Sequence, residues 1–129
     1  MENILDASAI LSLILRETGH EAVTQALSAG SAASTVNLAE VTSRCARVGM
    51  PADAIRRLVG LLPVAWIDAD QDLAFRVGDL AAPLKPFGLS LGDRCCLALA
   101  MREQVPAVTA DRAWAGVAPL LGVEVRLIR

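Results

Sequence analysis

Short apolar runs alternate with helical patterns along the whole chain, and this alternation is the feature that most constrains its fold. Strands separated by helices pair in parallel through right-handed crossovers. We therefore expect an α/β protein: a three-layer α/β/α sandwich with a mainly parallel central sheet. The runs expected to form strands cover residues 3–5, 31–34, 63–67, 105–109 and 123–128.

Helices are expected between these runs. In one of them, apolar residues recur at helical spacing at Leu38, Val41, Cys45 and Val48. The stretch 95–101 is apolar on all sides, which predicts a buried helix. The expected helices cover residues 7–16, 19–27, 36–48, 51–61, 70–80 and 90–102, with a loop at 81–89 and a short turn or helix at 111–115.

The length of 129 residues suits one domain, 1–129, and no repeat or low-complexity tract divides it. A hydrophobic share of 54% excludes a disordered chain. No stretch offers the roughly 20 mostly apolar residues that a membrane span needs. The first residues carry an acid where a signal peptide carries positive charge, so we expect a cytoplasmic protein.

Cysteine and histidine chemistry has little to work with. The three cysteines, Cys45, Cys95 and Cys96, show no CxxC spacing, and His20 is the one histidine. A zinc site of the Cys/His type is therefore not expected, nor is catalysis by a histidine pair. We expect the thiols to be buried as small hydrophobic groups.

Four acids stand in apolar surroundings. Asp6 and Asp111 each follow an expected strand, while Glu40 and Asp93 lie near the starts of expected helices. Each has a structural alternative: Asp6 and Asp111 as helix caps or turn acids, Glu40 and Asp93 as parts of capping boxes with Asn37 and Ser90.

Taken together, the four acids favour a functional site. Strand ends and first helical turns share one rim of an α/β/α sheet, where ligands collect. Clustered carboxylates repel one another unless a cation holds them, and hard oxygen ligands suit Mg²⁺ or Mn²⁺. Such ions neutralise a phosphodiester and position a water of lowered pKa for attack.

The remaining charge favours a polyanionic substrate weakly. Without the four acids the chain has 10 acidic and 12 basic residues, eleven of them arginine. Arg44 and Arg47 fall on the helical face of Glu40, and Arg94 and Arg112 directly follow two of the acids. These four arginines are candidate contacts to the phosphates of such a substrate, with solvated surface residues as the alternative.

The segments LDASAIL, VNLAEV, LSLGDRCCLALA and VTADRAW, in this order, resemble the PIN-domain ribonucleases and, more narrowly, the VapC-type toxins of toxin–antitoxin pairs. The resemblance covers essentially the whole chain. It implies Mg²⁺- or Mn²⁺-dependent hydrolysis of RNA phosphodiester bonds by an activated water.

The resemblance also assigns roles to residues. Asp6, Asp93 and Asp111 would bind the metal, and Glu40 would bind it or orient the attacking water. Some relatives carry a further acid after the last motif, which residues 112–115 lack, so one or two metals remain open. The polar residues expected to support the pocket are Ser8, Asn37 and Thr109.

Partners follow from the same resemblance. It implies a homodimer and a small antitoxin that covers the active-site groove. Two other functions stay open: a non-catalytic PIN-like module that binds RNA or protein, and an Asp-based, Mg²⁺-dependent phosphatase. The phosphatase is disfavoured because Asp6-Ala7-Ser8 lacks the second acid of an Asp-x-Asp motif.

Overall fold

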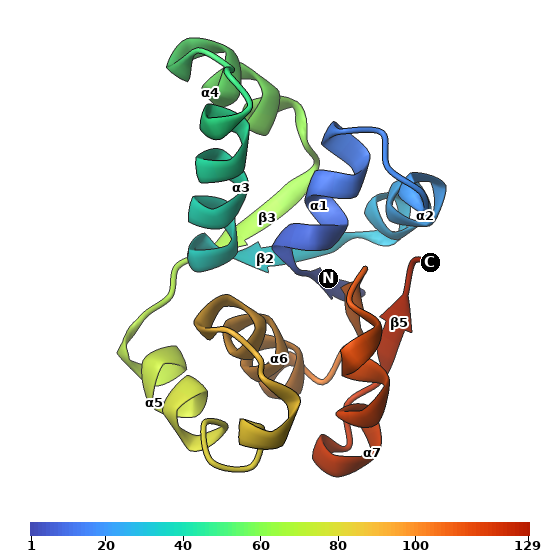
Figure 1. The fold of residues 1–129 in the computed structure, drawn as a ribbon, viewed down its shortest axis with the longest axis vertical. Coiled ribbons are helices and arrows are strands. Elements are labelled where there is room, and N and C mark those ends of the chain that lie inside the picture. Colours follow the sequence, from blue (N-terminus) through green and yellow to red (C-terminus); the bar gives the residue numbers. More distant parts are fainter.

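A computed structural model describes residues 1–129 and contains one five-stranded sheet in which every strand pair is parallel (Figure 1). The strand order is β3-β2-β1-β4-β5. The expected α/β/α fold with a parallel sheet is confirmed. The strands are β1 (Asn3–Leu5), β2 (Ser31–Ser34), β3 (Val64–Ile67), β4 (Ala107–Thr109) and β5 (Val125–Leu127).

Helices connect the strands and cover both faces of the sheet (Figure 1). No helix combines the length and the apolar character that crossing a membrane requires. The helices are α1 (Ala7–Ile14), α2 (His20–Ala29), α3 (Thr35–Arg47), α4 (Ala52–Leu61), α5 (Gln71–Asp79), α6 (Leu91–Glu103) and α7 (Ala118–Leu121), with 3₁₀ turns η1 (Lys85–Phe87) and η2 (Arg112–Gly116).

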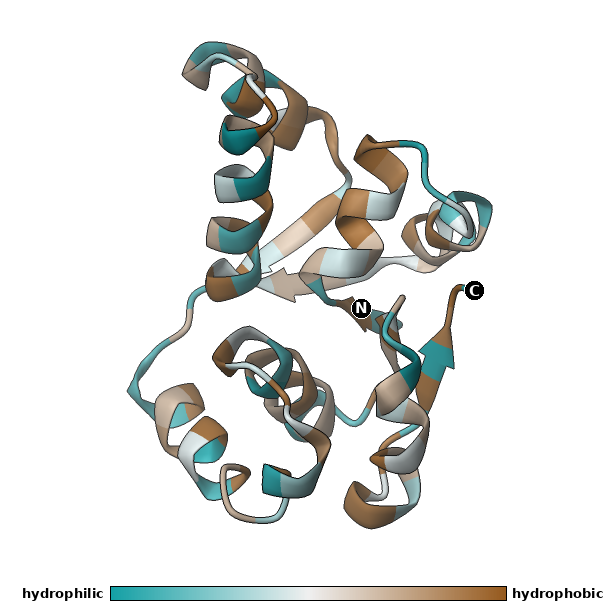
Figure 2. Ribbon diagram, viewed as in Figure 1, coloured by the Kyte–Doolittle hydropathy of each residue, from teal (hydrophilic) through white to brown (hydrophobic).

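Two hydrophobic cores lie on opposite faces of the sheet because successive strand residues point to opposite sides. In β1, Ile4 packs with α5, α6 and the segment after β4, whereas Leu5 packs with α1 to α4. Ala32 and Ala33 of β2 divide in the same way. In Figure 2, α3 is hydrophobic along the side that faces β3 and α1 and hydrophilic along its outer side. Each face thus supports its own helical layer.

The direction in which strands are added to the sheet reverses between β1 and β4. From β1 the chain builds β2 and β3 on one side, and it returns to β4 on the other. In open parallel sheets, ligands bind at the carboxyl ends of strands where the order reverses in this way. Asp6 and Asp111 follow the two strands that flank this point.

Several element ends differ from the sequence predictions for local reasons. Helix α1 ends at Ile14 rather than at residue 16, and Arg16 adopts a left-handed conformation with φ 56°. Helix α2 begins one residue later than expected, because Gly19 has a left-handed φ of 97°. A Cβ at Gly19 would also collide with the Ile128 carbonyl. The expected loop at 81–89 contains η1, and α7 was not anticipated.

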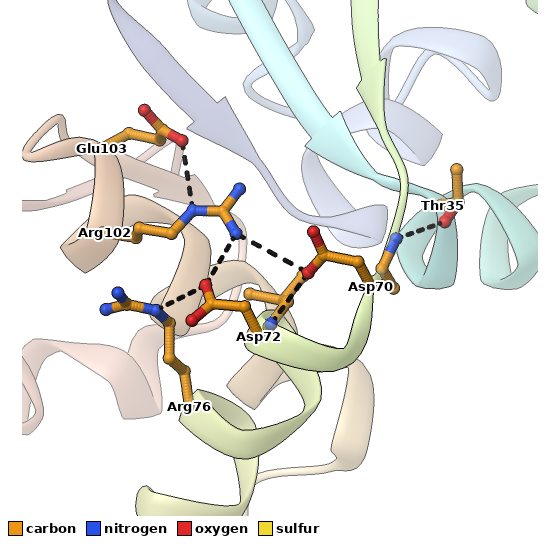
Figure 3. A network of polar contacts seen from close by, with 8 residues as sticks. Thr35, Asp70, Asp72, Arg76, Arg102 and Glu103 are labelled. Carbon is orange, nitrogen blue, oxygen red and sulfur yellow. Dashed lines mark hydrogen bonds and ion pairs between the residues drawn. The ribbon is translucent and has the colours of Figure 1, made fainter.

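An ion-pair network ties α5 to α6 (Figure 3). Arg102 of α6 lies 3.3 Å from the Asp72 carboxylate and 3.9 Å from that of Asp70, and its Nε lies 3.2 Å from Glu103. Arg76 binds the same Asp72 at 2.9 Å. The Arg76 hydrogen bond lowers the pKa of the Asp72 carboxyl below its ordinary range. Exposed ion pairs each contribute little to the free energy of folding. The network therefore serves mainly to orient α5 and α6 relative to each other.

Helix α6 offers a test of the packing. Leu97 is fully buried in the core that α6 forms with the sheet, whereas Leu91 at the start of the same helix is 59% exposed. We expect Leu97→Ala to lower the free energy of unfolding by about 2–5 kcal/mol, because it leaves a cavity. Leu91→Ala should change it by about 0.5 kcal/mol or less. Urea denaturation measures both, and equal losses would contradict this packing.

Candidate active site

The structure brings all four acids to one pocket at the carboxyl end of the sheet. The pocket has a volume of about 240 Å³. Its walls come from the start of α1, one face of α3, the start of α6 and the segment after β4. The lining residues are Asp6, Ala7, Ser8, Leu11, Glu40, Arg44, Arg47, Asp93 and Asp111.

Asp6 lies at the base of the pocket and is 3% exposed. It caps α1, since its Oδ1 accepts the Ala9 N–H at 2.8 Å. Ser8 Oγ donates to the same oxygen at 2.7 Å, and Thr109 Oγ1 donates to Oδ2 at 2.5 Å. The cap predicted for Asp6 is therefore real, and the carboxylate faces the pocket as well.

Burial dominates the electrostatics of Asp6. It raises the pKa of the Asp6 carboxyl from 3.8 to about 6, although the bonds from Thr109, Ala9 and Ser8 lower it. The nearby charge of Asp93 adds a smaller increase. A buried carboxylate is costly when it is charged and lacks a countercharge. Asp6 is thus a group that gains from a cation.

Glu40 enters the pocket from the second turn of α3. Asn37 Nδ2 donates to Glu40 Oε1 at 2.8 Å. The alternative in which Asn37 and Glu40 form a capping box is wrong, because Ser34, three residues before Asn37, caps the helix. Its Oγ accepts the Asn37 N–H at 3.1 Å. Partial burial raises the pKa of the Glu40 carboxyl, and the charge of Asp93 raises it further against the Asn37 bond.

Asp93 and Asp111 each close a local turn with one oxygen. Asp93 Oδ2 accepts the Ser90 N–H at 2.9 Å, and Ser90 Oγ accepts the Asp93 N–H at 3.2 Å. The capping box predicted for Ser90 and Asp93 is confirmed. Asp111 Oδ1 accepts the Ala113 N–H at 3.0 Å at the start of η2.

Three of the carboxylates keep one oxygen without a protein donor: Oε2 of Glu40, Oδ1 of Asp93 and Oδ2 of Asp111. No three acids converge closely enough in this structure to form a ready-made metal cluster. The donor chemistry nevertheless suits a hard cation, since the pocket supplies carboxylate oxygens and no nitrogen or sulfur ligand.

The four arginines divide into two pairs. Arg44 and Arg47 line the pocket on the face of α3 that carries Glu40, as the spacing predicts, and neither forms an ion pair. Arg94 and Arg112 do not line the pocket. Arg94 Nη1 instead donates to the Val77 carbonyl of α5 at 3.0 Å.

Two residues of the site were missed by the sequence analysis. Ser34 supports Asn37, and its signal was its place directly before a helical pattern. Gly92 lies under the Glu40 carboxylate, where a Cβ would collide with it. The sequence carries no local sign of that contact, because the two residues are 52 positions apart. Of the polar residues expected to support the pocket, Ser8 and Thr109 bind Asp6, and Asn37 binds Glu40.

A PIN domain family model matches residues 4–119, and the chain therefore belongs to the PIN domain family. A comparison with curated proteins found no match.

Three solved structures share the fold over nearly the full length of both chains. DNA-bound VapBC from Salmonella typhimurium has a TM-score of 0.77 at 16% identity, covering 100% of this chain and 99% of that one. VapBC2 from Rickettsia felis, bound to a DNA fragment from its promoter, has a TM-score of 0.75 at 17% identity, with 98% of each chain covered. A toxin–antitoxin complex from Klebsiella pneumoniae has a TM-score of 0.72 at 23% identity, covering 99% and 98%.

We expect Asp6 to make the stability of the protein depend on pH. Its folded-state pKa is about 6 and its ordinary value is 3.8, so the folded chain binds the proton more tightly. Relative to Asp6→Asn, the wild type should therefore lose stability as pH rises from 3.8 to about 6, and the deficit should persist above that range. The difference has an upper limit of about 3 kcal/mol.

The measurement is urea denaturation of both proteins between pH 4 and pH 8 in a chelator. The difference between the two curves cancels the contributions of the other groups. Two parallel curves would show that the Asp6 carboxyl titrates alike in the folded and unfolded chains.

Proposed function

We propose that the protein is a Mg²⁺- or Mn²⁺-dependent endoribonuclease that acts as the toxin of a toxin–antitoxin pair. The observation that carries the proposal is the set of acids in one pocket. Asp6 is buried with a raised pKa, and beside it Glu40, Asp93 and Asp111 each present a free carboxylate oxygen. Membership of the PIN domain family supports the same function.

The cation would be held by Asp6, Asp93 and Asp111, with Glu40 as a further ligand or as the group that orients water. A bound Mg²⁺ or Mn²⁺ neutralises phosphodiester charge and lowers the pKa of water. The protein supplies the fixed orientation of its ligands. Ser8 and Thr109 hold Asp6, as Asn37 holds Glu40. Such supporting bonds orient ligands and tune their affinity.

The reaction is hydrolysis without a covalent enzyme intermediate. Water adds to phosphorus, the bond to one ribose oxygen breaks, and the products are a phosphomonoester end and a hydroxyl end. Glu40 suits the task of accepting the proton that the water loses, because its pKa is raised and its Oε2 is free. His20 has no part in this, since it lies on α2 away from the pocket lining.

Arg44 and Arg47 give the pocket an affinity for phosphate. They rise from α3 beside Glu40 and form no ion pair within the chain. Arginine binds phosphate through paired N–H donors. We assign these two residues to the phosphates of the RNA strand near the cleaved bond.

The first test is metal-dependent cleavage of structured RNAs by the wild type and by Asp93→Asn. The variant keeps an oxygen for the Ser90 N–H, so it should fold normally, yet it loses the charge of a ligand. We expect activity to fall roughly 100-fold or more, beyond what loss of an outer hydrogen bond costs.

Asp53→Asn is the matched control, because Asp53 lies in the first turn of α4 and outside the pocket. It should keep full activity. Equal cleavage by the wild type and Asp93→Asn would contradict the proposed role of Asp93. Metal binding by the wild type without any cleavage would favour a non-catalytic PIN module.

The role as a toxin is supported by structural likeness. One similar structure is a toxin–antitoxin complex, and the other two are VapBC assemblies bound to DNA. We propose that this chain also has a small antitoxin that covers the groove above the four acids, and that it forms a homodimer.

Expression of the chain alone should arrest the growth of a bacterial host, because cleavage of cellular RNA stops protein synthesis. Expression of Asp93→Asn at the same level should not. Co-expression of a small protein encoded beside it should restore growth and co-purify with the chain. Growth curves with matched protein levels measure this, and arrest by both forms would rule out RNA cleavage as the cause.

A further inference from the structure

Helix α3 meets helix α6 where the Glu40 carboxylate lies directly over Gly92. A Cβ at Gly92 would overlap Glu40 Oε1 and would lie 2.7 Å from Oε2. The backbone of Gly92 is ordinary helix, so conformation does not call for glycine here. The end of the Glu40 side chain occupies the space of a Cβ here, so a side chain at position 92 would push the carboxylate aside.

Asn37 bridges the two helices in a single orientation. It is 1% exposed, and its Nδ2 donates to Glu40 Oε1 at 2.8 Å and to the Gly92 carbonyl at 3.1 Å. Its Oδ1 accepts from Ser34 Oγ at 2.8 Å. A flipped amide would place its oxygen against two acceptors, so the network permits one arrangement.

The bridge reaches the residue next to Asp93. Gly92 and Asp93 belong to the same first turn of α6, and the Ser90 capping box fixes that turn. Asn37 therefore links the position of Glu40 on α3 to that of Asp93 on α6. These are two of the three acids that keep a free oxygen.

We propose that Ser34, Asn37 and Gly92 form a positioning unit that sets the distance between the Glu40 and Asp93 carboxylates, and thereby the metal affinity of the pocket. Ser34 orients the Asn37 amide, and the amide holds Glu40 Oε1. Gly92 has no side chain and so leaves room for the Glu40 carboxylate. The inference rests on the proposed function, in which these acids hold the cation. It adds that the spacing between them is controlled by residues that touch neither metal nor RNA.

The test is Mn²⁺ binding to the full chain without RNA, measured by calorimetry or by electron paramagnetic resonance. Gly92→Ala should weaken binding about tenfold or more, in the range that supporting residues contribute. Gly78→Ala is the matched control: Gly78 also lies in a helix, at an exposed position with open space for a Cβ. It should bind Mn²⁺ as the wild type does. Thermal unfolding followed by circular dichroism checks that both variants fold.

A double-mutant cycle separates positioning from general damage. Glu40→Gln removes the group through which the unit acts, so Gly92→Ala should have little further effect on Mn²⁺ affinity in that background. Asn37→Ala should behave in the same way, which keeps the test open if one variant folds poorly.

Three results would overturn the inference. The first is a Mn²⁺ affinity of Gly92→Ala within twofold of the wild type, together with a weak affinity of Glu40→Gln. The second is a double variant in which the effects of Gly92→Ala and Glu40→Gln on Mn²⁺ affinity multiply. Either result contradicts the positioning unit and leaves the proposed function intact. A wild type that binds no Mn²⁺ contradicts the proposed function itself and removes the inference with it.

Discussion

The burial of one carboxylate organises this molecule. Asp6 lies where β1 ends, α1 begins and β4 passes alongside, and its hydrogen bonds come from the latter two: the Ala9 amide and Ser8 hydroxyl of α1, and the Thr109 hydroxyl at the end of β4. The same bonds that fix the first helix on the sheet therefore fix the base of the pocket. Desolvation still outweighs these donors, as the raised pKa of Asp6 records. A substitution of Asp6 would therefore affect both the packing of α1 on the sheet and the base of the pocket.

Much of the fold was predictable because its cause is local. Alternating short strands and helices define a parallel sheet, and each strand was found in the expected part of the chain. The meeting of the four acids was also predictable, since strand ends and the first turns of helices share one rim, although Glu40 lies in the second turn of α3. The structural explanation of these acids does not conflict with the proposed functional one, because Asp93 uses one oxygen in its capping box and keeps the other free at the pocket.

The sequence predictions failed where contacts between residues far apart in the chain determine the local structure. The sequence allows a helix cap at Asn37, but Ser34 is the cap of α3. The side-chain amide of Asn37 is therefore free to donate to Glu40 and to the Gly92 carbonyl. The contact of Gly92 with Glu40 depends on how two helices pack, which no local pattern reveals. Arg94 looked like a pocket residue because it follows an acid, yet successive helical residues diverge, and it binds Val77 instead.

Two of the acids stand at helix starts, Asp6 as the cap of α1 and Asp93 in the first turn of α6. The backbone amides there carry the positive end of each helix dipole, equivalent to roughly half an elementary charge. The protein therefore provides a partial countercharge of its own at the point where its acids crowd together. These amides offset part of the repulsion between the acids before any cation is bound, so the proposed metal site would not depend on a cation alone for its countercharge.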